Sequence, residues 1–138
     1  MNELEKIISK LSNMMTQVEE SSKEQFGLSE LTLTQMNYLE TINQLENPNI
    51  TELATALKLT KPTVKVSIDK LIEKEYVYKV QSDEDRRSSH LHLTEKGKKI
   101  NQMHDFAHKQ IAESVSKRLS KTEREILVVL LNRVLSNK

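Results

Sequence analysis

The chain has 138 residues, 36% of them apolar, and a formal net charge of +1, which predicts one domain whose modest core a partner subunit would help to bury. Because it has no cysteine, a disulfide framework, a thiolate zinc site and a thiol redox switch are excluded. No apolar run approaches the roughly 18 residues of a membrane helix, and the start, MNELEKIISK, lacks the pattern of a signal peptide, so we expect a cytoplasmic protein.

Two helices are predicted in the N-terminal third. Between residue 3 and about residue 25, an apolar stripe recurs at helical spacing, formed by Leu4, Ile8, Leu11, Met15 and Val18. Gly27 marks its end. Thr32 with Gln35 has the pattern of a capping box, which predicts a second helix that ends before Asn47 and Pro48.

A helix-turn-helix is predicted next. Asn49 with Glu52 forms another capping box before the segment ITELATALK, and Thr60 is placed to cap the segment KPTVKVSIDKLIEKE. The second of these helices has an apolar face of Val64, Ile68, Leu71 and Ile72, and its polar residues are largely basic. Two short helices joined by a turn of about three residues are typical of DNA-binding proteins.

A hairpin and two more helices complete the chain. Residues 76–81 and 89–93 have the composition and alternation of strands. Thr94 is placed to cap a long helix, and Ser120 with Glu123 predicts a last one. That last helix is apolar nearly all round from Ile126 to Leu131, so we expect it to be buried on more than one side.

Charge is segregated along the chain. Residues 1–57 carry a net charge of −6, residues 58–99 of +4 and residues 100–138 of +3. A basic middle that contains the helix-turn-helix favours a nucleic-acid surface. Arg86 and Arg87 lie in the predicted hairpin loop, where guanidinium groups can reach a minor groove. Taken alone, however, the loop is more typical of a solvated, charged turn.

The order of these elements, together with DEDRRSSHLHLTEKG, resembles the winged-helix regulators of the multiple antibiotic resistance regulator (MarR) family. Asp85, Arg87 and LTEKG match the family's wing motif, whereas Ser82 and Glu84 stand where Asp and Arg are frequent. The resemblance implies one mainly α domain over residues 1–138 with a small β-hairpin: a winged helix-turn-helix at 32–97 and dimerisation helices at 1–27 and 100–138. It also implies a homodimeric DNA-binding regulator, usually a repressor.

In this interpretation the helix that begins at Lys61 enters the major groove. The candidates for base or phosphate contact are Thr60, Lys61, Thr63 and Lys65. Arg87 is expected in the minor groove and Arg86 on the sugar-phosphate backbone. Asp85 and Asp69 are expected to brace the wing, with Asp69 pairing with a wing arginine; the alternative for Asp69 is an ion pair within its own helix.

An effector is also considered. His104 and His108 lie four residues apart, a spacing that zinc sites use. The resemblance to zinc-responsive relatives suggests Glu19 or Glu20 as a third ligand. The alternative is that both are ordinary surface histidines. Many relatives respond to small aromatic anions instead, for which Phe26, Met36 and Tyr38 could line a pocket if they are not core residues.

Catalytic constellations are lacking in the sequence: it has no Ser/His/Asp, Cys/His, paired-carboxylate or glycine-rich phosphate motif. We therefore do not expect an enzyme. The remaining alternative to DNA binding is a winged-helix module that binds protein, because fold alone does not decide function.

Overall fold

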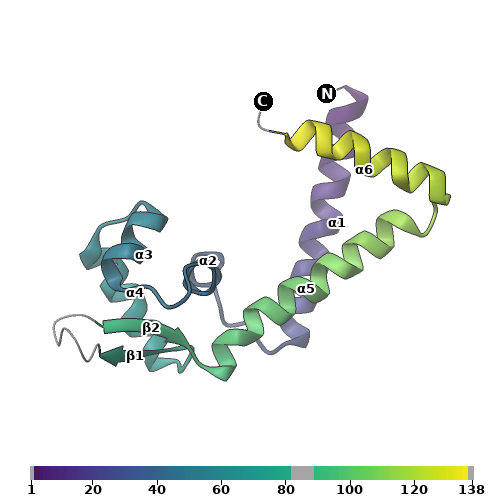
Figure 1. Cartoon of the computed structure of the whole chain (residues 1–138). Coiled ribbons are helices and arrows are strands. Elements are labelled where there is room, and N and C mark those ends of the chain that lie inside the picture. Colours follow the sequence, from purple (N-terminus) through teal and green to yellow (C-terminus); the bar gives the residue numbers. More distant parts are fainter. Residues whose placement is uncertain (1, 82–88, 137–138) are drawn as a thin grey trace. The chain divides into compact units, whose positions relative to one another are not determined.

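The computed structural model describes residues 2–81 and 89–136. These residues form helices and one two-stranded hairpin, as predicted (Figure 1). The elements are α1 (Glu3–Gln25), α2 (Leu33–Gln44), α3 (Ile50–Leu57), α4 (Lys61–Glu73), β1 (Val77–Gln81), β2 (Ser89–Leu93), α5 (Glu95–Ser116) and α6 (Lys121–Leu135). None of the helices in this part of the chain is long and apolar enough to cross a membrane.

Local sequence signals explain where the helices begin and end. The three predicted capping boxes all form, at the starts of α2, α3 and α6. In the first, the Gln35 amide donates to Thr32 Oγ1 over 3.1 Å, and the Thr32 amide donates to Gln35 Oε1 over 3.0 Å, which satisfies two otherwise unpaired N–H groups. α1 ends as predicted, because Gly27 takes the left-handed conformation with φ 71°.

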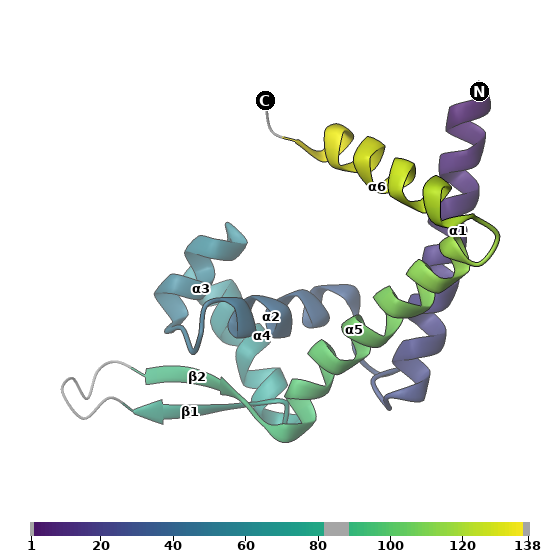
Figure 2. The same ribbon diagram turned by 45° about the vertical axis from the view of Figure 1, so that its right-hand side comes forward.

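The hairpin is antiparallel, with Val77 opposite Leu93 and Gln81 opposite Ser89 (Figure 2). We expected the first strand to begin at Tyr76, and it begins one residue later. The reason is that the Tyr76 amide donates to the Leu71 carbonyl in a turn that closes α4, over 2.9 Å, after Glu75 has adopted a left-handed φ of 68°. The Tyr76 side chain is fully buried in the core, and its carbonyl accepts a hydrogen bond from the Thr94 amide over 3.0 Å.

Contacts along the chain divide it into two compact units. We call residues 20–104 the winged-helix unit, and residues 1–19 with 105–138 the terminal-helix unit. Residues 20–27 and 100–104, predicted to belong to the dimerisation helices, thus group with the winged helix by their contacts.

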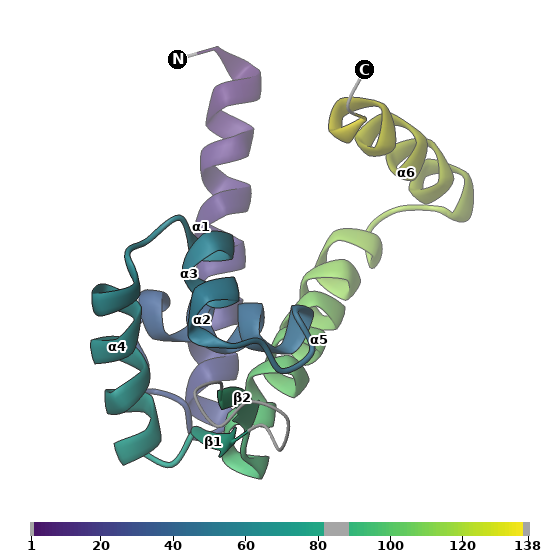
Figure 3. The same ribbon diagram turned by 60° about the vertical axis from the view of Figure 1, so that its left-hand side comes forward.

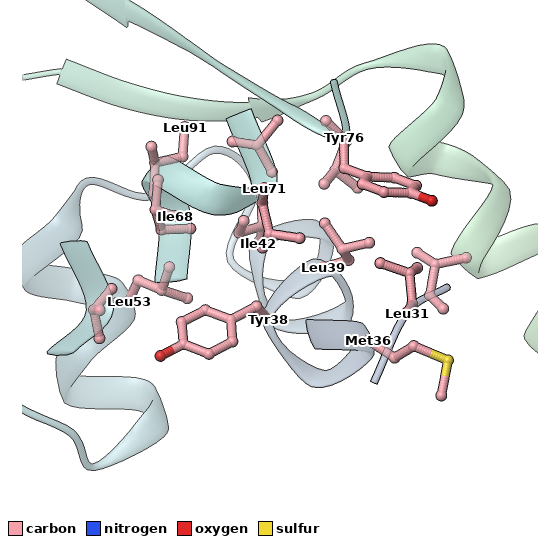
Figure 4. Close-up of a cluster of buried hydrophobic side chains, with 14 of the residues drawn as sticks. Leu31, Met36, Tyr38, Leu39, Ile42, Leu53, Ile68, Leu71, Tyr76 and Leu91 are labelled. Carbon is pink, nitrogen blue, oxygen red and sulfur yellow. The ribbon is translucent and has the colours of Figure 1, made fainter. Parts of the chain in front are cut away.

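The core of the winged-helix unit is formed by side chains from every element around it. Ile42 of α2, Leu71 of α4 and Leu91 of β2 point toward one another in Figure 4 and are almost fully buried. Met36 and Tyr38 are also buried, and Phe26 packs against the same cluster. These three residues therefore belong to the core. They do not line an effector pocket, the other role that the sequence allowed for them.

The terminal-helix unit differs from this pattern. α6 has no buried residue, and Ile126, Val128 and Leu131 are each about half exposed. A single chain therefore does not bury this helix, and its burial on more than one side remains a prediction that involves a partner. The apolar stripe of α1 is exposed in the same way from Leu4 to Met15.

Candidate nucleic-acid interface

A tight turn joins α3 to α4. α3 ends at Lys58, which adopts the left-handed conformation with φ 57°, and the Leu59 amide donates to the Ala54 carbonyl over 3.0 Å. Thr60 then caps α4 by accepting a hydrogen bond from the Thr63 amide. The three residues of the turn are the number predicted, and they fix the start of α4 against α3.

α4 has two distinct faces. Val64, Ile68 and Leu71 are completely buried, whereas the predicted contact residues Lys61, Thr63 and Lys65 are exposed. Figure 3 shows α4 at the edge of the winged-helix unit. The helix therefore presents a polar face with two lysines close to its N-terminus, while its opposite face anchors it in the core.

Thr60 is exposed but has a structural task. Its hydroxyl accepts from the Thr63 amide over 3.4 Å and donates to Thr63 Oγ1 over 2.9 Å. The two threonines thus stabilise the first turn of α4 together. A contact from either of them to DNA remains a prediction.

Asp69 contacts the hairpin through a residue that the sequence did not indicate, and its role in bracing the wing remains a prediction. Its carboxylate lies 3.9 Å from the ammonium group of Lys79 on β1, whereas the wing arginines predicted as its partners lie outside the described residues. Both side chains are more than one third exposed, so the ion pair contributes little to stability. It does link α4 to the hairpin. Asp85, Arg86 and Arg87 lie outside the described residues.

The LTEKG segment forms the base of the wing. Thr94 Oγ1 donates to the Glu75 carbonyl over 2.6 Å and accepts from the Gly97 amide over 3.0 Å. A Cβ atom added at Gly97 would lie 2.2 Å from the Tyr76 carbonyl oxygen, a distance that side chains do not tolerate. Only glycine lets α5 begin this close to the Tyr76 backbone, which explains the glycine of the motif in structural terms.

Around the same point, Tyr76, Glu30 and Lys96 form a polar cluster. The Tyr76 hydroxyl donates to Glu30 over 2.5 Å, and the Lys96 ammonium lies 3.5 Å from the Glu30 carboxylate and 4.3 Å from the centre of the Tyr76 ring. The hydrogen bond from Tyr76, followed by the charge of Lys96, lowers the pKa of Glu30. Burial, together with this hydrogen bond, raises the pKa of Tyr76 above its usual range.

The second strand is tied to the turn before α3. The Leu91 amide donates to the Pro48 carbonyl over 2.8 Å, and His90 Nδ1 lies 3.1 Å from the Asn47 carbonyl oxygen. The hairpin is therefore held on both sides, by this turn and by α4. Sequence reasoning missed these contacts and the Tyr76 cluster, because the partners are more than 40 residues apart.

A groove of about 650 Å³ lies within the winged-helix unit, lined by the end of α2, both strands and the start of α5. We call it the wing groove. Tyr78 and His92 form one part of its lining, and their rings are stacked with centroids 5.2 Å apart. Lys98, Asn101 and Gln102 contribute polar groups from α5. Its residues are different from the Phe26, Met36 and Tyr38 that the sequence suggested.

The predicted metal ligands fall in two units. His104 belongs to the winged-helix unit, where its Nε2 atom lies 2.5 Å from the Glu40 carboxylate on α2. His108 and Glu19 belong to the terminal-helix unit. Among the described residues, no group of three or more His, Cys, Asp or Glu side chains is placed to hold a metal ion. Zinc binding through these three residues remains a prediction.

Known proteins resemble the chain in sequence and in fold. Residues 31–89 match the model of the MarR family. The uncharacterized HTH-type transcriptional regulator YhjH of Bacillus subtilis is 29% identical over 100 residues, which make up 72% of this chain and 57% of that protein. The chain thus spans little more than half the length of this relative.

Solved structures share the fold over nearly the whole chain. Streptococcus pneumoniae FabT, solved in complex with DNA, is 26% identical, with a TM-score of 0.69 over 94% of this chain and 90% of that chain. A mutant of S. aureus MepR bound to an oligodeoxyribonucleotide is 23% identical, with a TM-score of 0.75 over 98% and 97%; at this identity the likeness shows the fold alone.

The named relatives are transcriptional regulators, which agrees with the expectation that the chain is not an enzyme. The predicted resemblance to the MarR family is confirmed, because the matched segment spans the helix-turn-helix and β1 and ends at the first residue of β2. Over residues 31–89 the chain is thus similar to the MarR family, and its named relatives are transcriptional regulators.

Proposed function

We propose that the protein is a sequence-specific transcriptional regulator that binds double-stranded DNA with α4 in the major groove. The observation that carries this proposal is the two-faced α4, whose buried side is fixed in the core while Lys61, Thr63 and Lys65 are exposed near its N-terminus. In helix-turn-helix proteins the N-terminal residues of the second helix approach the base edges. FabT and MepR, which share the fold, were solved with DNA.

The wing supplies the second contact in this proposal. Arg87 would enter the minor groove, Arg86 would contact the backbone, and Asp85 would help to brace the loop. The contacts of β1 with Asp69 and of β2 with the Pro48 carbonyl support it, because they hold the two strands that carry this loop. Such a regulator would work in the cytoplasm, where its DNA target lies.

We further propose that the protein acts as a homodimer on a pseudo-palindromic operator, as a repressor. The exposed apolar residues of α1 and α6 support a dimer, because apolar surface of this extent is usually covered by a partner. Two α4 helices related by a two-fold axis would read half-sites one helical turn apart, or a multiple of it. The terminal-helix unit thus sets the spacing, and the winged-helix unit reads the sequence.

A small aromatic anion is the effector that we propose, and the wing groove is its binding site. The stacked rings of Tyr78 and His92 offer an aromatic surface, and the Lys98 ammonium, now 3.3 Å from the exposed Glu95, offers a positive charge. A ligand bound there would contact both strands of the wing. It would therefore bind the DNA-competent and DNA-incompetent positions of the wing with different affinities, which is what regulation requires.

The proposal can be tested by selecting duplexes from a random library with the full chain and measuring affinity at several salt concentrations. We expect a pseudo-palindrome to be enriched. Lys65→Ala should lower the slope of log affinity against log salt by about one for a lost phosphate contact. Arg87→Ala should weaken binding by about 1 to 3 kcal/mol. Enrichment of no sequence would contradict the proposed function.

A further inference from the structure

The exposed face of α4 carries a large apolar side chain that the core does not use. Val66 is 58% exposed. It lies two residues after Val64 and two before Ile68, so at about 100° per residue it points about 200° away from each of these buried side chains. Val66 therefore projects from the middle of the face that we propose to enter the major groove.

Folding gives no reason for valine at this position. A β-branched residue has a lower helix propensity than alanine or lysine, and a side chain this exposed contributes little buried area. The surroundings also differ from those of an apolar docking surface, because Thr63, Lys65 and Lys70 are all exposed nearby on the same helix. Protein interfaces are depleted of charged residues at their centre, whereas a DNA-binding surface needs positive charge to contact phosphates.

We propose that Val66 determines specificity by contacting the C5-methyl group of a thymine in the major groove. The thymine methyl is the apolar group that the major groove offers, and apolar side chains distinguish it from the bare edge of cytosine. The nearby carboxylate of Asp69 is paired with Lys79, so it does not leave an isolated negative charge beside the DNA. This inference rests on the proposed DNA binding and deepens it by naming the group that is read.

The test uses the duplex selected by the wild-type protein. Each thymine is replaced in turn by deoxyuridine, which removes only the methyl group, in both half-sites together. We expect one symmetric pair to weaken wild-type binding by about fourfold for each methyl group lost from an apolar contact. Val66→Ala should bind the thymine and deoxyuridine duplexes equally at that pair, because the partner of the methyl group is gone.

Thr63→Ser provides the matched control, since it removes a neighbouring exposed methyl group and keeps the hydroxyl that pairs with Thr60. It should retain the full response to deoxyuridine. The inference is overturned if Val66→Ala keeps the response, if Thr63→Ser abolishes it, or if no thymine methyl matters. In each of these outcomes a sequence has still been selected, so the proposed function stands; its own failure would appear earlier, as a library without an enriched duplex.

Discussion

In the winged-helix unit most large apolar side chains are buried, whereas in the terminal-helix unit most are exposed. Leu39, Leu53 and Ile68 represent the first group, with no exposed surface. Leu131 of α6 represents the second and is 49% exposed; in the terminal-helix unit only Ala107 is fully buried among the described residues. The two units have similar sequence signals for helices, so burial, and not helix content, separates them.

The difference indicates what each unit needs. The winged-helix unit closes its own core from α2, α3, α4 and the hairpin, so its stability is set within one chain. The terminal helices lack such a core and depend on another surface, for which we propose a second copy. Destabilising the first unit should therefore act independently of protein concentration, and changing the second should act through the concentration of the dimer.

The largest effect is expected for Leu39→Ala. The side chain is fully buried in the winged-helix core, and truncating a buried leucine costs about 2 to 5 kcal/mol of unfolding free energy. Chemical denaturation followed by circular dichroism measures this loss. We expect the same loss at low and high protein concentration when the signal comes from the winged-helix unit, and a loss that depends on concentration would contradict the comparison.

Leu131→Lys tests the other unit. If a second copy covers α6, an unpaired ammonium group there should cost about 2 to 3 kcal/mol, which corresponds to roughly a 30- to 150-fold weaker dimer. Sedimentation measures the dissociation constant. Leu33→Lys is the matched control, because Leu33 is 73% exposed at the start of α2 in the winged-helix unit. If the wild type and Leu131→Lys had the same dimer dissociation constant, α6 would not form the dimer interface.

Much of this comparison could be predicted from the sequence, because it depends on local signals. Capping boxes act within four residues, so Thr32, Asn49 and Ser120 placed the starts of their helices correctly. The apolar spacing of Val64, Ile68 and Leu71 likewise identified the buried face of α4, which separates core from candidate contact residues.

Contacts between distant residues could not be predicted in this way. The pairing of Asp69 with Lys79 and of His104 with Glu40 depends on how elements pack, and a spacing along the chain carries no information about it. What covers α6 could not be predicted for a related reason. The composition of α6 indicates that its apolar residues are buried, but it does not tell whether the same chain or a second chain buries them.

Gly97→Ala tests how closely α5 approaches the wing. The new Cβ atom would meet the Tyr76 carbonyl oxygen at 2.2 Å, and we expect a loss of about 1 to 3 kcal/mol, typical of forced overpacking. Gly27→Ala is the control: it meets no atom within 4 Å, so only its positive φ opposes the substitution and about 1 kcal/mol should be lost. Thermal unfolding compares the two, and a smaller loss at Gly97 than at Gly27 would contradict the structure.

The smallest effect is expected at the cluster below the wing, where Tyr76→Phe removes the hydroxyl that donates to Glu30. One hydrogen bond contributes about 1 kcal/mol, so denaturation at neutral pH should show a loss of this size.

Because the folded protein lowers the pKa of Glu30, the ionised carboxylate stabilises the fold above its ordinary pKa, and this contribution is lost as the pH falls through the lowered value. Glu30→Gln keeps an acceptor without the charge, so its stability should fall less steeply in acid than that of the wild type. An unchanged acid profile would mean that the Glu30 carboxylate does not contribute to the stability of the wing base.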